Sequence, residues 1–263
     1  MNCLAGNPWP EIKWGESDRP AILVDGQLYS FKGISDNRVS GKCAYVVGTN
    51  HNNIEAICSF LNVESLQLYD MRVKDLSPLT GISDLKHLAI RWNTKASSID
   101  PIGKINAIET LILDDTPKIA SLEPLRQLKN LTNLEFSGGI WNKNNVKSLR
   151  PLSSLAKLHS LTLLNLKIAD DSLRPLAKCR SLRELHISNQ FPTEEYAFLA
   201  VKMPSTKCDY FAPYIRLAAP IDGKDIMVVG RRKPFLNSQS DIKKLEKYGD
   251  RFNQLKRDFA SDK

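Results

Sequence analysis

The amino-acid sequence predicts an α/β repeat protein, in which short parallel strands alternate with short helical return limbs along a right-handed solenoid. Two observations predict this fold. Apolar residues recur in an L-x-x-L-x-L pattern with a period in the low twenties, and a proline marks the segment between successive copies. A single repeat of this size cannot bury its apolar face, whereas a stack of repeats forms a continuous core.

The strand pattern fixes which side chains should point into the core. Side chains alternate across a strand, so the last two apolar residues of each copy should point inward and their neighbours outward. A degenerate first copy, Ala44-Tyr-Val-Val47, brings the count to about seven turns. We therefore expect parallel strands near residues 45, 67, 89, 112, 135, 165 and 186. The six clear copies are Val63/Leu66/Leu68, Leu85/Leu88/Ile90, Ile108/Leu111/Leu113, Leu131/Leu134/Phe136, Leu161/Leu164/Leu166 and Leu182/Leu185/Ile187.

The proline marker predicts where each return limb begins, because a proline in the first turn of a helix removes no hydrogen bond that the helix needs. The spacing of the prolines is regular until Pro124 and then lengthens before Pro151, with the extra residues in a loop, Gly138–Asn145. We also expect the limb from Leu149 to Leu161 to be longer than its counterparts. The five copies are Leu76-Ser-Pro-Leu79, Ile99-Asp-Pro-Ile102, Leu122-Glu-Pro-Leu125, Leu149-Arg-Pro-Leu152 and Leu173-Arg-Pro-Leu176.

Both ends of a solenoid need a cap, because the terminal repeats would otherwise expose core. Alternating apolar residues around Asp25-Gly26 predict an N-terminal hairpin. At the other end, strands at Lys207–Tyr214 and Asp225–Gly230, a turn at Asp222-Gly223 and an amphipathic helix from Ser240 are expected. The predicted domains are a cap at 1–40, repeats at 41–203 and a C-terminal cap at 204–263.

On these motifs the sequence resembles the short leucine-rich repeats, of about 22 residues, that occur in phosphatase-regulatory proteins and internalins. The resemblance covers about residues 44 to 200 and implies a protein-binding role and a bacterial source. The family's asparagine position is the point of departure, because only Asn93 fits it. The other repeats have Met71, Thr116, Gly139, Ala169 and Gln190 there.

Composition favours a soluble, cytoplasmic protein. The chain has 42% hydrophobic and 25% charged residues, and its N-terminus lacks the pattern of a signal peptide. No apolar run is long enough to cross a membrane, so no membrane association is expected. Cys3, Cys43, Cys58, Cys179 and Cys208 form no CxxC pair, and the sequence therefore predicts reduced cysteines, with neither a disulfide framework nor a zinc site.

The net charge of +8 is concentrated near the C-terminus, where residues 224–263 hold eleven Lys or Arg and six Asp or Glu. The cluster Arg231-Arg-Lys233 could contact phosphate, but no aromatic residues interleave with it. A solvated turn is the favoured interpretation, and nucleic-acid binding is the alternative.

The outward strand positions predict a binding surface on the concave face. They combine aromatic, aliphatic and arginine side chains with acids, a composition typical of interface cores. Trp92 and Trp141 are expected in loops at the same edge of the sheet. The predicted partner-binding residues are Gln67, Tyr69, Arg91, Trp92, Ile112, Asp114, Glu135, Trp141, Asn165, Lys167 and His186.

No constellation in the sequence predicts catalysis, a metal or a cofactor. His87 and His186 are the two histidines expected on the concave face, and about four repeats separate them. The predicted function is a protein-binding scaffold, acting on an enzyme as a regulator or inhibitor. Alternatives are a bacterial immunity protein or antitoxin, the substrate-recognition module of an effector, and a nucleic-acid-binding protein; the oligomeric state is left open.

Overall fold

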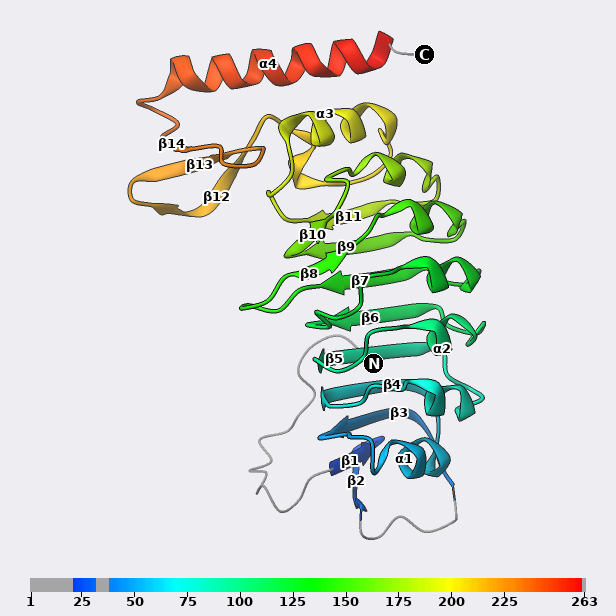
Figure 1. Cartoon of the computed structure of the whole chain (residues 1–263). Helices are drawn as coiled ribbons and strands as arrows, with labels where there is room; N and C mark the ends of the chain where they lie inside the picture. The colour runs from blue at the N-terminus through cyan, green and yellow to red at the C-terminus, as the bar shows by residue number, and fades with distance from the viewer. Residues whose placement is uncertain (1–20, 32–37, 262–263) are drawn as a thin grey trace.

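The computed structural model describes residues 21–31 and 38–261. Its main feature is a nine-stranded sheet in which the strands of successive repeats stack in chain order (Figure 1). Neighbouring repeats pair in parallel, which confirms the predicted leucine-rich-repeat solenoid. The parallel strands are β3 (Val39–Val47), β4 (Leu61–Met71), β5 (His87–Asn93), β6 (Thr110–Asp114), β7 (Asn133–Ser137), β9 (Ser160–Leu164) and β11 (Glu184–Ile187).

The N-terminal hairpin is confirmed and extends the main sheet. Strands β1 (Ala21–Val24) and β2 (Gln27–Ser30) pair antiparallel, and β1 also pairs antiparallel with β3. Asp25 and Gly26 have φ angles of 45° and 88°, the left-handed backbone that a tight two-residue hairpin turn requires. The hairpin therefore covers the edge that β3 would otherwise expose.

The return limbs are mostly 3₁₀-helices with proline in their first turn, as the proline marker predicts. The limb after Leu149 has five residues, like its neighbours, so the expectation of a longer limb is wrong. A Cβ on Gly103 would lie 2.6 Å from the carbonyl oxygen of Pro124, so the limbs stack too closely there for a side chain. The limbs are α1 (Ile54–Phe60), Ser77–Gly81, α2 (Asp100–Gly103), Glu123–Gln127, Arg150–Ser154 and Arg174–Lys178.

One apolar core runs between the sheet and the return limbs, and it contains the leucines that the pattern places inside. Leu111 and Leu113, for example, are fully buried. Asn93 is also buried and donates from Nδ2 to the carbonyl oxygen of Val73 at 3.0 Å. Asn144 and Gln190 make comparable bonds, to the carbonyl oxygens of Ser137 and Leu166, so the loss of the asparagine ladder is partly compensated.

A helix that the sequence analysis did not identify, α3 (Thr193–Lys202), closes the last repeat. Its Tyr196 is fully buried, and the hydroxyl donates to the carbonyl oxygen of Ser188 at 2.6 Å. The Tyr196 hydroxyl oxygen also accepts hydrogen bonds from the backbone N–H groups of Gln190 and Phe191. Tyr196 therefore provides hydrogen-bond partners for backbone N–H and C=O groups at the end of the last repeat, which a cap must satisfy.

The C-terminal cap differs from the prediction in one strand. Residues 209–211 form a short 3₁₀-helix, because Tyr210 and Phe211 pack under α3 and do not alternate along a strand. Of the predicted strand Lys207–Tyr214, only Lys207 pairs with the main sheet, through a bridge to Glu184. The turn at Asp222-Gly223 is confirmed, with φ angles of 49° and 73°. The cap strands are β12 (Tyr214–Ile221), β13 (Lys224–Val228) and β14 (Phe235–Leu236).

The amphipathic helix is α4 (Ile242–Ser261), and it lies across α3 at the end of the solenoid (Figure 1). Phe252 and Leu255 are buried in the continuous core. Leu245 is only partly buried and packs against the cap strands. The helix is therefore part of the cap, with α3 between it and the last strand.

Candidate functional site

The strand register arranges the outward side chains in two columns across the sheet. The first column runs Tyr45, Gln67, Ala89, Ile112, Glu135, Thr162 and His186, and the second runs Val47, Tyr69, Arg91, Asp114, Ser137 and Leu164. Adjacent members of a column are one strand spacing apart, about 4.8 Å. Every repeat agrees with the sequence analysis except the sixth, whose strand is β9.

The placement of Asn165 and Lys167 on the concave sheet is wrong. In β9 the inward residues are Leu161 and Leu163, so Thr162 and Leu164 occupy the two outward positions. Asn165 follows the strand, and Lys167 belongs to β10 (Leu166–Ile168), which pairs with β8 (Asn144–Val146) in a separate small sheet. Leu164 is 40% exposed and adds an apolar side chain that the sequence analysis missed.

Exposure divides the first column into two parts. Gln67 and Ile112 are 4% and 8% exposed, so neither is accessible to a partner in this structure. Glu135 is partly exposed and His186 is exposed, two strands further along the sheet. The accessible part of the predicted surface therefore centres on the second column.

An aromatic pair joins the second column to the residues that follow it, with Tyr69 in the column and Trp92 directly after Arg91. The rings of Tyr69 and Trp92 meet edge to face, with centroids 6.1 Å apart, and the residues are 39% and 46% exposed. Edge-to-face packing of this kind holds both rings in place. The pair is thus a fixed aromatic surface presented to solvent.

Trp92 has a left-handed backbone, with φ of 60°. Every residue that follows the second column in β3, β4, β6 and β9 is also left-handed, namely Gly48, Asp70, Asp115 and Asn165. Glycine, aspartate and asparagine tolerate this conformation, whereas a bulky aromatic residue is strained in it. Strained residues concentrate at functional sites, and this observation singles out Trp92.

Charged groups lie directly beside the aromatic pair. The Arg91 guanidinium bonds the Asp114 carboxylate on the next strand at 3.1 Å, and both side chains are partly exposed. Burial raises the pKa of Glu135; Arg91 opposes that rise, and Asp114 adds to it. Burial and the neighbouring Asp114 also raise the pKa of Asp115. Three carboxylates therefore share this part of the surface with one guanidinium.

The inserted loop presents the most exposed apolar side chains in the described part of the chain. Ile140 and Trp141 are 90% and 92% exposed, while the base of the loop is fixed by hydrogen bonds. The Gly138 N–H donates to the carbonyl oxygen of Leu164 at 2.9 Å, and Asn165 Nδ2 donates to that of Gly139 at 2.6 Å. The base of the loop is therefore anchored to the following repeat.

The loop base touches the charged region. A Cβ on Gly139 would lie 2.3 Å from the Asp115 carboxyl carbon, and the Gly139 N–H bonds that carboxylate. Trp92, Asp115 and Gly139 thus lie side by side at the C-terminal ends of the neighbouring strands β5, β6 and β7. We call the exposed residues here the strand-end surface, defined as Tyr69, Arg91, Trp92, Asp114, Asp115, Glu135, Ile140 and Trp141.

Comparison with known proteins adds a likeness at the level of the fold. Two internalins are similar. Internalin C2 from Listeria monocytogenes has a TM-score of 0.47 and 24% identity, over 62% of this chain and 68% of its own. Internalin F from the same organism has a TM-score of 0.47 and 20% identity, over 69% of this chain and 56% of its own. No protein-family model and no curated protein matches the sequence.

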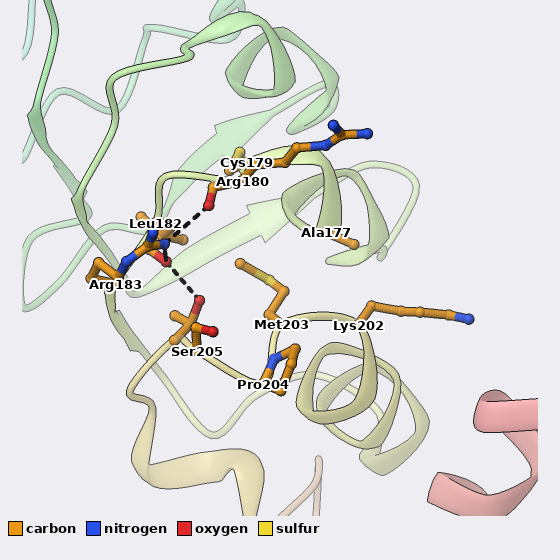
Figure 2. Close-up of a pocket in the computed structure, with 10 residues that line it drawn as sticks. Ala177, Cys179, Arg180, Leu182, Arg183, Lys202, Met203, Pro204 and Ser205 are labelled. Atoms are coloured by element: carbon orange, nitrogen blue, oxygen red, sulfur yellow. Dashed lines mark hydrogen bonds between the residues drawn. The ribbon is translucent and has the colours of Figure 1, made fainter.

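Two pockets that adjoin α3 lie away from the predicted residues. One, of about 220 Å³, lies between the last repeat and the end of α3 (Figure 2). There the Arg183 guanidinium donates to the carbonyl oxygens of Arg180 and Leu182, and Thr206 donates to that of Leu182, so the polar groups stabilise the local fold. The other, of about 720 Å³, lies on the return limbs beside Arg150 and Phe198.

The cysteines and the basic cluster also differ from simple expectation. Cys43 is disulfide-bonded, which contradicts the prediction of reduced cysteines, whereas Cys58, Cys179 and Cys208 are free.

In the basic cluster, Arg231 is bonded to the last repeat, because its Nε donates to the carbonyl oxygen of Gln190 at 2.8 Å and its guanidinium pairs with Asp171. The cluster therefore includes a structural contact.

Within residues 21–31 and 38–261, no helix is long and apolar enough to span a membrane. The same part of the chain holds no group of three or more His, Cys, Asp or Glu side chains arranged to bind a metal ion.

Proposed function

We propose that the protein is a non-catalytic scaffold that binds another protein through the strand-end surface. The observation that carries the proposal is the Tyr69–Trp92 pair, exposed and held on adjacent strands, with Trp92 in a backbone conformation that a bulky residue seldom adopts. Tryptophan, tyrosine and arginine are the side chains that most often dominate protein interfaces. Their grouping beside an exposed Ile140–Trp141 tip supports one continuous contact area.

The first test is affinity capture of the native partner, identified by mass spectrometry. Tyr69→Ala and Arg91→Ala should each abolish or sharply weaken capture without lowering the melting temperature. Ile221→Ala is the matched control, because Ile221 is 51% exposed in the distant cap hairpin. Capture that survives both substitutions but is lost in the control would overturn the proposal.

If the protein acts as an inhibitor, by covering the active site of an enzyme or a toxin, a second result is expected. The captured partner should lose its activity in a stoichiometric complex and recover it when Tyr69→Ala replaces the native protein. A partner whose activity is unchanged in the complex would exclude both the inhibitor and the immunity-protein forms.

The disulfide at Cys43 bears on location. Disulfides persist in oxidising compartments and are rare in the cytosol, so this bond favours a location outside the cytosol over the cytoplasmic one that the sequence predicts. Mass spectrometry of the native protein, alkylated before any reduction, tests this. A free Cys43 thiol in freshly isolated protein would restore the cytoplasmic prediction.

A further inference from the structure

The strand-end surface combines carboxylates with exposed aromatic rings, and this combination has a specific chemical preference. Asp114 and Glu135 are outward on adjacent strands, and Asp115 follows Asp114 at the base of the inserted loop. Arg91 is the cation that pairs with them, through Asp114. Negative charge is thus gathered on a chain whose net charge is +8.

The free protein leaves these carboxylates without full compensation. Burial keeps the pKa values of Asp115 and Glu135 above their ordinary range; repulsion from Asp114 adds to the rise at both, and Arg91 partly offsets it at Glu135. A cation brought beside them would relieve that repulsion, because an opposite charge within a few ångströms favours the ionised form. An incoming anion would add to the repulsion.

The aromatic side chains favour the same ligand. Trp92 follows Arg91 in the chain and occupies the position equivalent to Asp115 on the neighbouring strand, and its ring is accessible together with that of Tyr69. A guanidinium or ammonium group is attracted to the face of an aromatic ring, most strongly to tryptophan. Carboxylates flanked by accessible rings therefore offer both an ion pair and a cation–π contact to one side chain.

We infer that the partner inserts an arginine or lysine side chain, flanked by apolar residues, into the strand-end surface. This inference rests on the proposed function and names the chemistry of the partner's epitope. The basic side chain contacts Asp114 and Glu135 beside the Trp92 ring, and the flanking apolar residues cover Ile140 and Trp141. Charge complementarity decides against an acidic or purely apolar epitope.

The probe is a phage-displayed library of random linear peptides, selected on the full chain. Arginine and lysine should be enriched next to apolar residues in the selected pool relative to the input library. A selected peptide is then synthesised, and its Kd is measured for the native protein and its variants. A pool enriched in acidic or uncharged peptides, or one without enrichment, would overturn the inference.

The variants separate charge recognition from binding in general. Glu135→Gln and Asp114→Asn should each weaken the peptide about tenfold, the scale of a lost charge contact at an interface. Glu64→Gln is the matched control, since Glu64 pairs with Lys86 near the start of β4, and it should leave the Kd unchanged. Replacing the peptide's arginine by glutamine should also raise the Kd about tenfold for the native protein. The same peptide change should raise the Kd little further for Glu135→Gln, because the two charges act through one contact.

The outcomes also distinguish this inference from the proposed function. If Trp92→Asn abolishes binding while Glu135→Gln and Asp114→Asn do not, the surface binds proteins but not through a cation, and the inference alone fails. If Trp92→Asn and Tyr69→Ala leave the Kd of the selected peptides unchanged, the peptides bind outside the strand-end surface, and both the inference and the proposed function fail.

Discussion

Leu163 and Leu164 are neighbours in β9, yet Leu163 is 1% exposed in the core and Leu164 is 40% exposed on the concave face. Their opposite environments identify the register of the sixth repeat. Leu163→Ala should cost roughly 2 to 5 kcal/mol, as for other fully buried leucines, and Leu164→Ala less than about 0.5 kcal/mol. Chemical denaturation of the two variants measures both values. Equal losses would contradict the register.

The error in that repeat shows what the sequence determines and what it leaves ambiguous. Leucines at 158, 161, 163, 164 and 166 satisfy the L-x-x-L-x-L template in two registers. The spacing from the limb proline resolves the ambiguity, because Pro78, Pro101 and Pro124 each precede the first inward strand residue, Leu88, Leu111 and Leu134, by ten residues. Pro151 therefore predicts Leu161 and then Leu163, a signal that the periodicity alone does not contain.

Other features depend on contacts that no periodic pattern encodes. Helix α3 is held by tertiary contacts, among them the hydrogen bonds of the buried Tyr196 hydroxyl and the packing of Leu199 in the core. Residues 209–211 form a turn because Tyr210 and Phe211 pack beneath that helix. In the candidate site, the aromatic and charged residues of the second column follow directly from the register. The burial of Gln67 and Ile112 and the left-handed backbone of Trp92 do not, since they depend on tertiary structure.

Trp92→Asn should separate stability from binding. Asparagine tolerates the left-handed backbone, and Asn165 occupies the equivalent place in a later repeat. Relief of strain, of order 1 kcal/mol, should offset the lost contact with Tyr69. We expect the free energy of unfolding to stay within about 0.5 kcal/mol of the native value or to rise, while partner capture weakens. A loss above about 2 kcal/mol would show that Trp92 is a structural residue.

Glu135 predicts a pH dependence of stability. Its pKa is raised by burial, so the folded state retains the proton to higher pH than the unfolded state does. Stability should therefore fall as pH rises from the ordinary carboxyl value, about 4.3, through the raised value. Glu135→Gln should be more stable than the native protein at pH 7, within about 1 kcal/mol, and similar near pH 4. Denaturation curves at both pH values test this, and a variant less stable at pH 7 would contradict it.

The C-terminal cap should be part of the cooperative fold. Phe252 is 1% exposed and belongs to the continuous core, so Phe252→Ala should cost roughly 3 to 5 kcal/mol. Ile242→Ala, at a residue 54% exposed on the same helix, is the control and should cost less than about 0.5 kcal/mol. Thermal melting of both variants and of a deletion of residues 236–263 gives the comparison. A soluble deletion with unchanged melting would show that α4 is an appendage.

Within the basic cluster, we expect Arg231 to contribute to the stability of the fold and Arg232 not to. Arg231→Ala removes the contacts to Gln190 and Asp171 and should cost about 1 kcal/mol, the scale of a partly exposed charged contact. Arg232→Glu, at an exposed residue of the same turn, should leave both stability and partner capture unchanged. Loss of capture in Arg232→Glu, with a strong dependence on salt, would favour the nucleic-acid alternative instead.

The most direct test of the proposed function is the equilibrium affinity of the purified partner for the native protein and for Tyr69→Ala, measured by surface plasmon resonance. Truncating a central aromatic anchor commonly costs 2 kcal/mol or more, so the Kd should rise about thirtyfold or more, while Ile221→Ala leaves it unchanged. A Kd that rises less than about twofold in Tyr69→Ala and in Arg91→Ala, in variants that melt like the native protein, would contradict the assignment of the strand-end surface as the binding site.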